Sequence, residues 1–242
     1  SSDTEIIVHL VARSHQDTVT DRLIDALKQI EGAFSLVCVA KDMLIGVRDP
    51  LGVRPLVLGK QNDAYVLASE SCALDIIGAE IVRDLDPGEM VVITKAGIES
   101  IKPFPAKQSR FCVFEYIYFA RPDSVLEGRG VYHARKTIGA ELAKESLANA
   151  DLVVPVPDSG VPAALGYAEA AHIPFDLGII RNHYIGRTFI QPTQKGRDDS
   201  VKMKHNANPS TVAGKRVVLV DDSIVRGTTS RKIVSMMRAA GA

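Results

Sequence analysis

The second half of the chain alternates between strand-like and helix-like patterns, and this alternation constrains the fold more than any other feature. The expected order is a helix over 137–148, a strand running into a loop over 151–160, a helix over 162–171, a strand over 175–180, a strand over 216–220 and a helix over 229–240. Strands that alternate with helices are typical of a parallel sheet with right-handed crossover connections. We therefore expect an α/β domain here.

The first half lacks this alternation and has short β-rich runs that are separated by turn residues. The expected strands cover 33–40, 43–49, 55–60, 64–70 and 89–95. A helix is predicted over 20–30, with Thr20 as its N-cap. Residues 101–110 carry two prolines and no periodicity, which predicts a linker. The chain should thus form two domains, 1–108 and 109–242.

Charge and cysteine usage narrow the setting and the partners. Lys and Arg together number 29, as do Asp and Glu, so no net positive charge attracts nucleic acid or an anionic membrane. No apolar run approaches the roughly 18 to 20 residues of a membrane span, and the N-terminus lacks the pattern of a signal peptide. Cys38, Cys72 and Cys112 are widely spaced, which argues against a disulfide framework. We expect a cytoplasmic protein without nucleic-acid or membrane partners.

Asp221 and Asp222 lie side by side directly after the apolar run 217–220. Adjacent carboxylates repel each other unless a cation or a hydroxyl-bearing ligand lies against them. The stretch that follows contains Ser223, Gly227, Thr228 and Thr229. Free backbone N–H groups at the start of the next helix would form a phosphate cradle there. Because ligands bind beyond the carboxyl ends of parallel strands, a ribose phosphate fits this pattern, although a solvated turn with an Asx cap is the alternative.

Four stretches carry a family resemblance that spans essentially the whole chain. "VVLVDDSIVRGTT" (217–229) resembles the phosphoribosyl pyrophosphate (PRPP) signature of type I phosphoribosyltransferases. Its "SIVRGTT" version, with "FEYIYFARPDS" (114–124), "NHYIGRTFIQP" (182–192) and "RDPLGVRPLVLG" (48–59), resembles the glutamine PRPP amidotransferases. The resemblance implies an α/β and α+β chain of two domains. These would be the C-terminal part of an N-terminal-nucleophile αββα glutaminase domain and a type I phosphoribosyltransferase parallel-sheet domain.

The resemblance also implies roles for residues around PRPP. Asp221 and Asp222 would contact the ribose hydroxyls, and Ser159 would face the pyrophosphate, so these three are the implied Mg²⁺-linked residues. The 5′-phosphate would be held by Ser223, Ile224, Val225, Arg226, Gly227, Thr228 and Thr229. Arg187 and Lys204 lie in the family's closing loop, and Lys204 matches a lysine that reaches the pyrophosphate. Lys204, Asp221 and Asp222 are the implied catalytic residues. For Asp158 and Ser159, capping of the following helix is the alternative role.

Glutamine chemistry is only partly represented. Asp3 matches the aspartate that grips the α-amino group of glutamine, whereas the family's N-terminal Cys is absent because the chain opens at Ser1. We therefore expect a fragment that lacks glutaminase activity on its own, with both ends interrupted. In one branch of the family, the cysteine before "FEYIYFARPDS" is a [4Fe–4S] ligand, which makes Cys112 a candidate in the full-length protein. Arg48, Asp49 and Arg54 are expected to brace a buried ionic turn.

The implied activity is synthesis of 5-phosphoribosylamine from PRPP and glutamine-derived ammonia, the first step of de novo purine biosynthesis. Purine nucleotides would be the inhibitors, and the protein would be a homo-oligomer, a tetramer by resemblance. Two alternatives stay open: a regulatory protein of phosphoribosyltransferase fold that only binds PRPP, and a salvage phosphoribosyltransferase for a free base. Ammonia-dependent pyrophosphate release separates the three.

Overall fold

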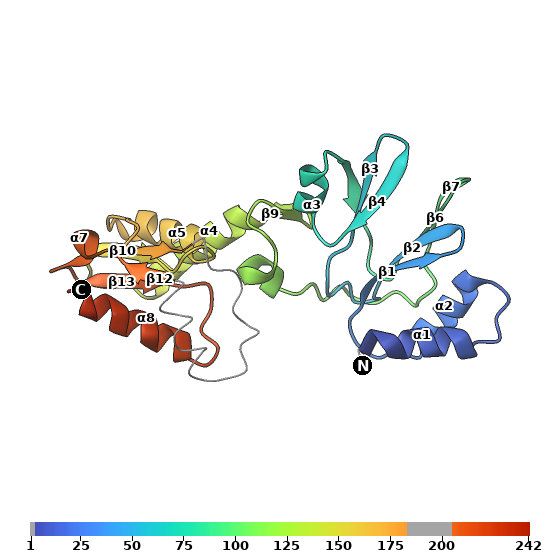
Figure 1. Ribbon diagram of the computed structural model, residues 1–242, viewed down its shortest axis with the longest axis horizontal. Coiled ribbons are helices and arrows are strands. Elements are labelled where there is room, and N and C mark those ends of the chain that lie inside the picture. The colour runs from blue at the N-terminus through green and yellow to red at the C-terminus, as the bar shows by residue number, and fades with distance from the viewer. Residues whose placement is uncertain (1–2, 183–204) are drawn as a thin grey trace. The chain divides into compact units, whose positions relative to one another are not determined.

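The computed structural model describes residues 3–182 and 205–242, and the chain divides into two compact units (Figure 1). The first unit contains the residues up to Glu115 together with 124–128. The second contains 116–123 and 129–242. No described helix is long and apolar enough to cross a membrane. The domain limits expected from the sequence stay a prediction.

Two helices open the first unit. Helix α1 (Asp3–Arg13) was not expected, and α2 (Val19–Lys28) confirms the helix predicted over 20–30. The prediction of Thr20 as N-cap is wrong, because the Thr18 hydroxyl accepts the Asp21 backbone N–H at 3.0 Å. Thr18 has extended backbone angles that suit a cap, while Thr20 already lies inside the helix.

Two antiparallel sheets complete the first unit. The four-stranded sheet has the order β1 (Ser35–Ala40), β2 (Met43–Arg48), β6 (Met90–Thr94) and β7 (Gly97–Ile101). The three-stranded sheet has the order β4 (Ala64–Ala68), β3 (Val57–Gln61) and β5 (Glu80–Asp84), with α3 (Ser71–Ile76) after β4 and β8 (Val125–Leu126) near the end of the unit. Leu23 and Leu27 of α2 pack on Ile45, Val47 and Met90 of the first sheet. The five predicted strands are confirmed, and β5 and β7 are additional.

The second unit contains the alternating elements. In chain order they are η1 (a π-helical turn, Glu115–Phe119, whose first residue belongs to the first unit), β9 (Arg129–Gly130), α4 (Val131–Glu145), β10 (Leu152–Pro155), α5 (Val161–Ala171), β11 (Ile179–Arg181), β12 (His205–Ala207), α7 (Pro209–Val212), β13 (Val217–Val220) and α8 (Thr228–Ala239). Helix α4 ends before the predicted residue 148, because the Tyr167 hydroxyl bonds the Ser146 carbonyl and the Ala148 N–H just beyond it.

Strands β10 and β13 pair in parallel, from Leu152↔Val217 to Pro155↔Val220. This confirms the parallel arrangement that the alternation predicted. The predicted strand over 175–180 is wrong in part: Phe175 makes a single parallel bridge to Val153, and the regular strand begins at Ile179. The chain turns between them, where Gly178 lies so close to Val154 and Val212 that a Cβ would clash. Strand β11 then pairs antiparallel with β12.

Helices cover the parallel pair on both faces. Successive side chains of a strand point to opposite sides, so each strand contributes to both contacts. Val153 and Val220 pack with Ala164, Tyr167 and Ala168 of α5 and with Ala143 of α4. Leu152 and Val154 face Ile233 and Met237 of α8. Figure 1 shows α8 on one side of the pair and α4 and α5 on the other. Strand β10 is therefore buried along its length, whereas β13 is half-buried up to Val220, and the carboxyl ends of both strands are where the chain can offer polar groups.

Candidate functional site

The loops that follow β10 and β13 leave the sheet at the same edge. Pro155 pairs with Val220, and the next residue, Val156, donates its backbone N–H to the Val220 carbonyl at 2.8 Å. Gly160 then lies against this strand end: a Cβ there would be 2.6 Å from the Val220 oxygen and 3.3 Å from the Asp221 Cα. Only a residue without a side chain fits at that distance. The loop with Ser159 is thereby brought beside the aspartate pair.

Asp221 and Asp222 are both half-buried at this edge. Burial raises the pKa of Asp221, and the neighbouring Asp222 charge acts in the same direction, although the Asp222 backbone N–H opposes the shift. That N–H donates to the Asp221 carboxylate at 2.9 Å, and the Ser223 hydroxyl donates to the Asp222 carboxylate at 2.8 Å. These are the local contacts expected for the alternative interpretation, a solvated turn with an Asx cap. Burial thus disfavours the ionised form of Asp221, and a cation or a hydroxyl donor against it would favour that form.

The loop after the aspartates ends at the start of α8. Gly227 is the N-cap, with φ +68°, and no side chain caps this helix end. The first backbone N–H groups of a helix point outward and carry partial positive charge, which is the arrangement that binds phosphate. Within the loop, Ile224 and Val225 are exposed by 71% and 84%. The helix end where a phosphate cradle was expected thus has no side-chain cap, and phosphate binding there stays a prediction.

The loop between β10 and α5 is held by side chains from β11 and β12. The Arg181 guanidinium forms an ion pair with the Asp158 carboxylate, and His205 Nε2 lies 3.3 Å from the Pro157 carbonyl oxygen. The Pro157–Asp158 peptide bond is cis. Capping of α5 by Asp158 or Ser159, the alternative role, is not found, because Gly160 is the N-cap and no side chain bonds the helix end. Sequence reasoning missed Arg181 and His205, since neither lies in a recognisable motif.

Three further predicted site residues belong to other parts of the chain. Arg187 and Lys204 lie outside the described residues. Asp3 is the first residue of α1 in the other unit. The ligand roles assigned to the individual residues of both units stay predictions.

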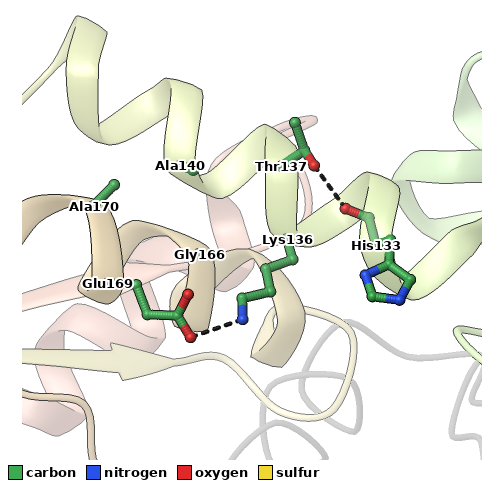
Figure 2. Close-up of a pocket in the computed structure, with 7 residues that line it drawn as sticks. All are labelled: His133, Lys136, Thr137, Ala140, Gly166, Glu169 and Ala170. Carbon is green, nitrogen blue, oxygen red and sulfur yellow. Dashed lines mark hydrogen bonds and ion pairs between the residues drawn. The ribbon is translucent and has the colours of Figure 1, made fainter.

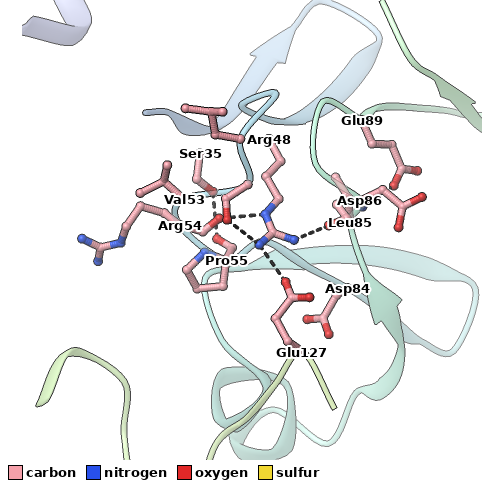
Figure 3. A network of polar contacts seen from close by, with 12 residues as sticks. Ser35, Arg48, Val53, Arg54, Pro55, Asp84, Leu85, Asp86, Glu89 and Glu127 are labelled. Atoms are coloured by element: carbon pink, nitrogen blue, oxygen red, sulfur yellow. Dashed lines mark hydrogen bonds and ion pairs between the residues drawn. The ribbon is translucent and has the colours of Figure 1, made fainter. Parts of the chain in front are cut away.

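The "RDPLGVR" stretch forms a buried polar network, as predicted (Figure 3). Arg48 is 1% exposed and donates to the carbonyls of Gly52, Arg54 and Leu85 and to the Glu127 carboxylate, all at 2.6–2.9 Å. The Asp49 carboxylate accepts the backbone N–H groups of Leu51 and Val53. Arg54 pairs with the buried Glu115 at 2.5 Å. These contacts brace the turns between the two sheets of the first unit.

The donor groups decide which metals fit. Two carboxylates and a hydroxyl at one strand edge suit Mg²⁺, which binds few protein oxygens and completes its shell with water and substrate oxygens. A [4Fe–4S] cluster usually has four thiolate ligands, and Cys112 would supply one. The described residues contain no group of three or more His, Cys, Asp or Glu that could hold a metal. Asp221, Asp222 and Ser159 would therefore hold Mg²⁺ only together with ligand oxygens, and Cys112 would supply one of the four ligands of a cluster.

An open pocket of about 420 Å³ lies away from the strand ends, between α4 and α5 (Figure 2). Its lining includes His133, Thr137 and the Lys136–Glu169 ion pair, whose atoms are 2.7 Å apart. The helices approach closely because Gly166 has no side chain; a Cβ there would clash with the Lys136 carbonyl. Of the predicted site residues that the structure describes, none lines this pocket.

Comparisons with known proteins match both halves. Residues 1–75 match a glutamine amidotransferase domain and residues 129–242 a phosphoribosyl transferase domain. The amidophosphoribosyltransferases of Rhizobium etli and Bacillus subtilis are 56% and 50% identical to the chain; all of the chain aligns, with 50% and 51% of the relatives. The solved structure of the B. subtilis glutamine PRPP amidotransferase complexed with ADP and GMP has a TM-score of 0.92 at 50% identity, covering 100% of this chain and 53% of that one.

The chain spans about half the length of the curated relatives it matches. The match extends over both compact units, and the two matched domains occur in the order that the sequence predicted. The chain belongs to the amidophosphoribosyltransferase family, with a glutamine amidotransferase domain followed by a phosphoribosyl transferase domain.

Proposed function

We propose that this chain binds PRPP at the common edge of β10 and β13 and acts in a glutamine-dependent amidophosphoribosyltransferase. The product would be 5-phosphoribosylamine, at the first step of de novo purine biosynthesis. The observation that carries the proposal is the close approach of Gly160, the residue after Ser159, to the end of β13 and to the backbone of Asp221. The names of the relatives support the same reading.

Each part of the edge has a chemical task in this proposal. The backbone N–H groups between Ser223 and Thr229 bind the 5′-phosphate at the start of α8. Asp221 and Asp222 accept hydrogen bonds from the ribose hydroxyls. Ser159 contacts the pyrophosphate, with Arg187 and Lys204 as further pyrophosphate ligands. Mg²⁺, held by Asp221, Asp222 and Ser159 with substrate oxygens, would neutralise charge on the leaving group.

The transfer itself moves one electron pair in and one out. The ammonia lone pair forms the new bond to C1 of the ribose, the electrons of the C1–O bond leave with pyrophosphate, and the nitrogen then loses one proton to pyrophosphate or water to give the amine. Positive charge develops on the ribose ring as that bond breaks. The carboxylates of Asp221 and Asp222 lie where they can stabilise this charge, provided that the ligand is oriented as proposed.

The remaining assignments belong to the full-length protein. Asp3 would bind the α-amino group of glutamine, and Cys112 would be a [4Fe–4S] ligand if the other cysteines are supplied by further chain. Purine nucleotides as inhibitors, a homo-oligomer and a cytoplasmic location are part of the proposal. The proposed domain limits of the two functional halves are 1–108 and 109–242.

An assay of pyrophosphate release from PRPP and Mg²⁺, with ammonia as nucleophile, tests the proposal. Release that requires ammonia and falls sharply in Asp222→Asn is the expected result. PRPP binding without ammonia-dependent release would instead favour a regulatory protein. Release that requires a free purine or pyrimidine base would indicate a salvage enzyme.

A further inference from the structure

The ion pair between Asp158 and Arg181 joins two segments that both border the proposed PRPP site. Asp158 precedes Ser159 in the loop after β10, and Arg181 is the last residue of β11. Arg181 is also the cross-strand partner of His205 in β12. His205 contacts the carbonyl of Pro157, in the same loop. The loop is therefore held from the side of β11 and β12 by two neighbouring residues.

The opposite side of this loop rests on β13. Gly160 lies against the Val220 carbonyl, and Val156 donates its N–H to the same oxygen. Residues 157–159 are thus held by β13, which contacts the flanking residues 156 and 160, and by the β11–β12 pair, which contacts 157 and 158. The orientation of Ser159 depends on both attachments. Among the described attachments of this loop, the one through Asp158 and Arg181 is ionic.

Arg181 neutralises the negative charge of Asp158 beside the proposed pyrophosphate position. An unpaired carboxylate next to Ser159 would repel a pyrophosphate group, because like charges at close range are unfavourable even in partly solvated sites. Pairing with Arg181 cancels this charge and turns the carboxylate toward β11. The pair is substantially exposed, with 58% of the Asp158 side chain and 40% of the Arg181 side chain accessible. Exposed pairs contribute little to folding stability, so structural support alone is a weak reason for it.

We propose that Arg181 is a positioning residue for pyrophosphate binding, which acts by holding and neutralising Asp158 in the loop before Ser159. This inference rests on the proposed function. It concerns the pyrophosphate part of the ligand alone. Binding of the 5′-phosphate, at the start of α8, should not depend on Arg181.

The test measures binding of three probes to the full chain by titration calorimetry: PRPP with Mg²⁺, inorganic pyrophosphate with Mg²⁺, and ribose 5-phosphate. Arg181→Gln should weaken PRPP and pyrophosphate binding roughly tenfold, as expected for one uncompensated like charge at short range, and leave ribose 5-phosphate unchanged. The double variant Asp158→Asn/Arg181→Gln should return to within about threefold of the wild type, because the repelling charge is gone. Arg181→Lys should retain most of the affinity.

Lys144→Gln is the matched control, since it removes a cation from another exposed ion pair of the same unit, Lys144–Glu141. It should change none of the three affinities. Equal weakening of all three probes by Arg181→Gln would overturn the inference in favour of a structural role. A double variant as weak as Arg181→Gln would overturn it as well, because Asp158 would then not be the source of the loss. Failure of the wild type to bind PRPP, with ribose 5-phosphate also unbound, would refute the proposed function itself.

Discussion

Replacing Gly160 by Ala should separate the two loops that form the proposed site. The backbone of Gly160 has φ −74°, which alanine adopts freely, so the change introduces no backbone strain. The added methyl would instead lie 2.6 Å from the Val220 oxygen and 2.8 Å from the Val156 oxygen, whereas ordinary contacts begin near 3.4 Å. Both obstacles are backbone atoms and cannot rotate away. We expect a loss of about 1–3 kcal/mol in the free energy of unfolding, the usual cost of overpacking, and weaker PRPP binding.

Gly130→Ala is the matched control. Gly130 also has an ordinary backbone, with φ −67°, and a Cβ there would meet only the His133 ring at 3.5 Å. This variant should change the free energy of unfolding by less than about 1 kcal/mol, because the reduced entropy of the unfolded chain is offset by the poorer fit of alanine at the N-cap of α4. Urea unfolding gives both stabilities, and calorimetric titration gives the PRPP affinities. A Gly160→Ala protein that matches the control in stability and affinity would refute the reasoning.

Three further variants test the electrostatics. Asp221→Asn should weaken PRPP binding yet stabilise the unliganded protein at neutral pH. Burial raises the pKa of Asp221, so the wild-type protein becomes less stable as pH rises through that pKa, and asparagine avoids this loss. Urea unfolding should show the stability gain of the variant fading toward acid pH. Burial would raise the pKa of Glu89, but hydrogen bonds from Arg83 and Ser100 lower it to about 2. Glu89→Gln should therefore destabilise the protein by roughly 2–3 kcal/mol above pH 5, with the difference from wild type shrinking as pH falls from about 4.5 toward 2; a constant difference would contradict this. Arg48→Gln should cost about 3 kcal/mol in urea unfolding, since it leaves the Leu85 and Gly52 carbonyls without their buried donor, and a cost below about 1 kcal/mol would contradict the bracing role.

The fold was most predictable where local pattern and tertiary environment agree. Strands β10 and β13 are short apolar runs bounded by turn residues, and both were expected close to their actual limits. Helix α1 was missed because its β-branched residues suit a strand as well. Its helical conformation is favoured by the packing of Ile7 and Val11 against the core of the first unit. The strand expected over 175–180 failed at Gly178, where contacts with α7 and β10 turn the chain.

The site was predictable only as far as its motifs are local. The position of Asp221 and Asp222 after a buried strand follows from the sequence alone. The role of Gly160 does not, because it depends on a strand end distant in the sequence. The same is true of Arg181, whose partner Asp158 precedes it by 23 residues. Long-range pairing of this kind leaves no periodic signal in a single sequence.

A crystal structure of the chain with a non-hydrolysable PRPP analogue and Mg²⁺ tests the central claim most directly. The 5′-phosphate should lie on the backbone N–H groups at the start of α8, with the ribose hydroxyls against Asp221 and Asp222 and the pyrophosphate beside Ser159. An analogue bound in the pocket between α4 and α5, or at any position away from the ends of β10 and β13, would contradict the account.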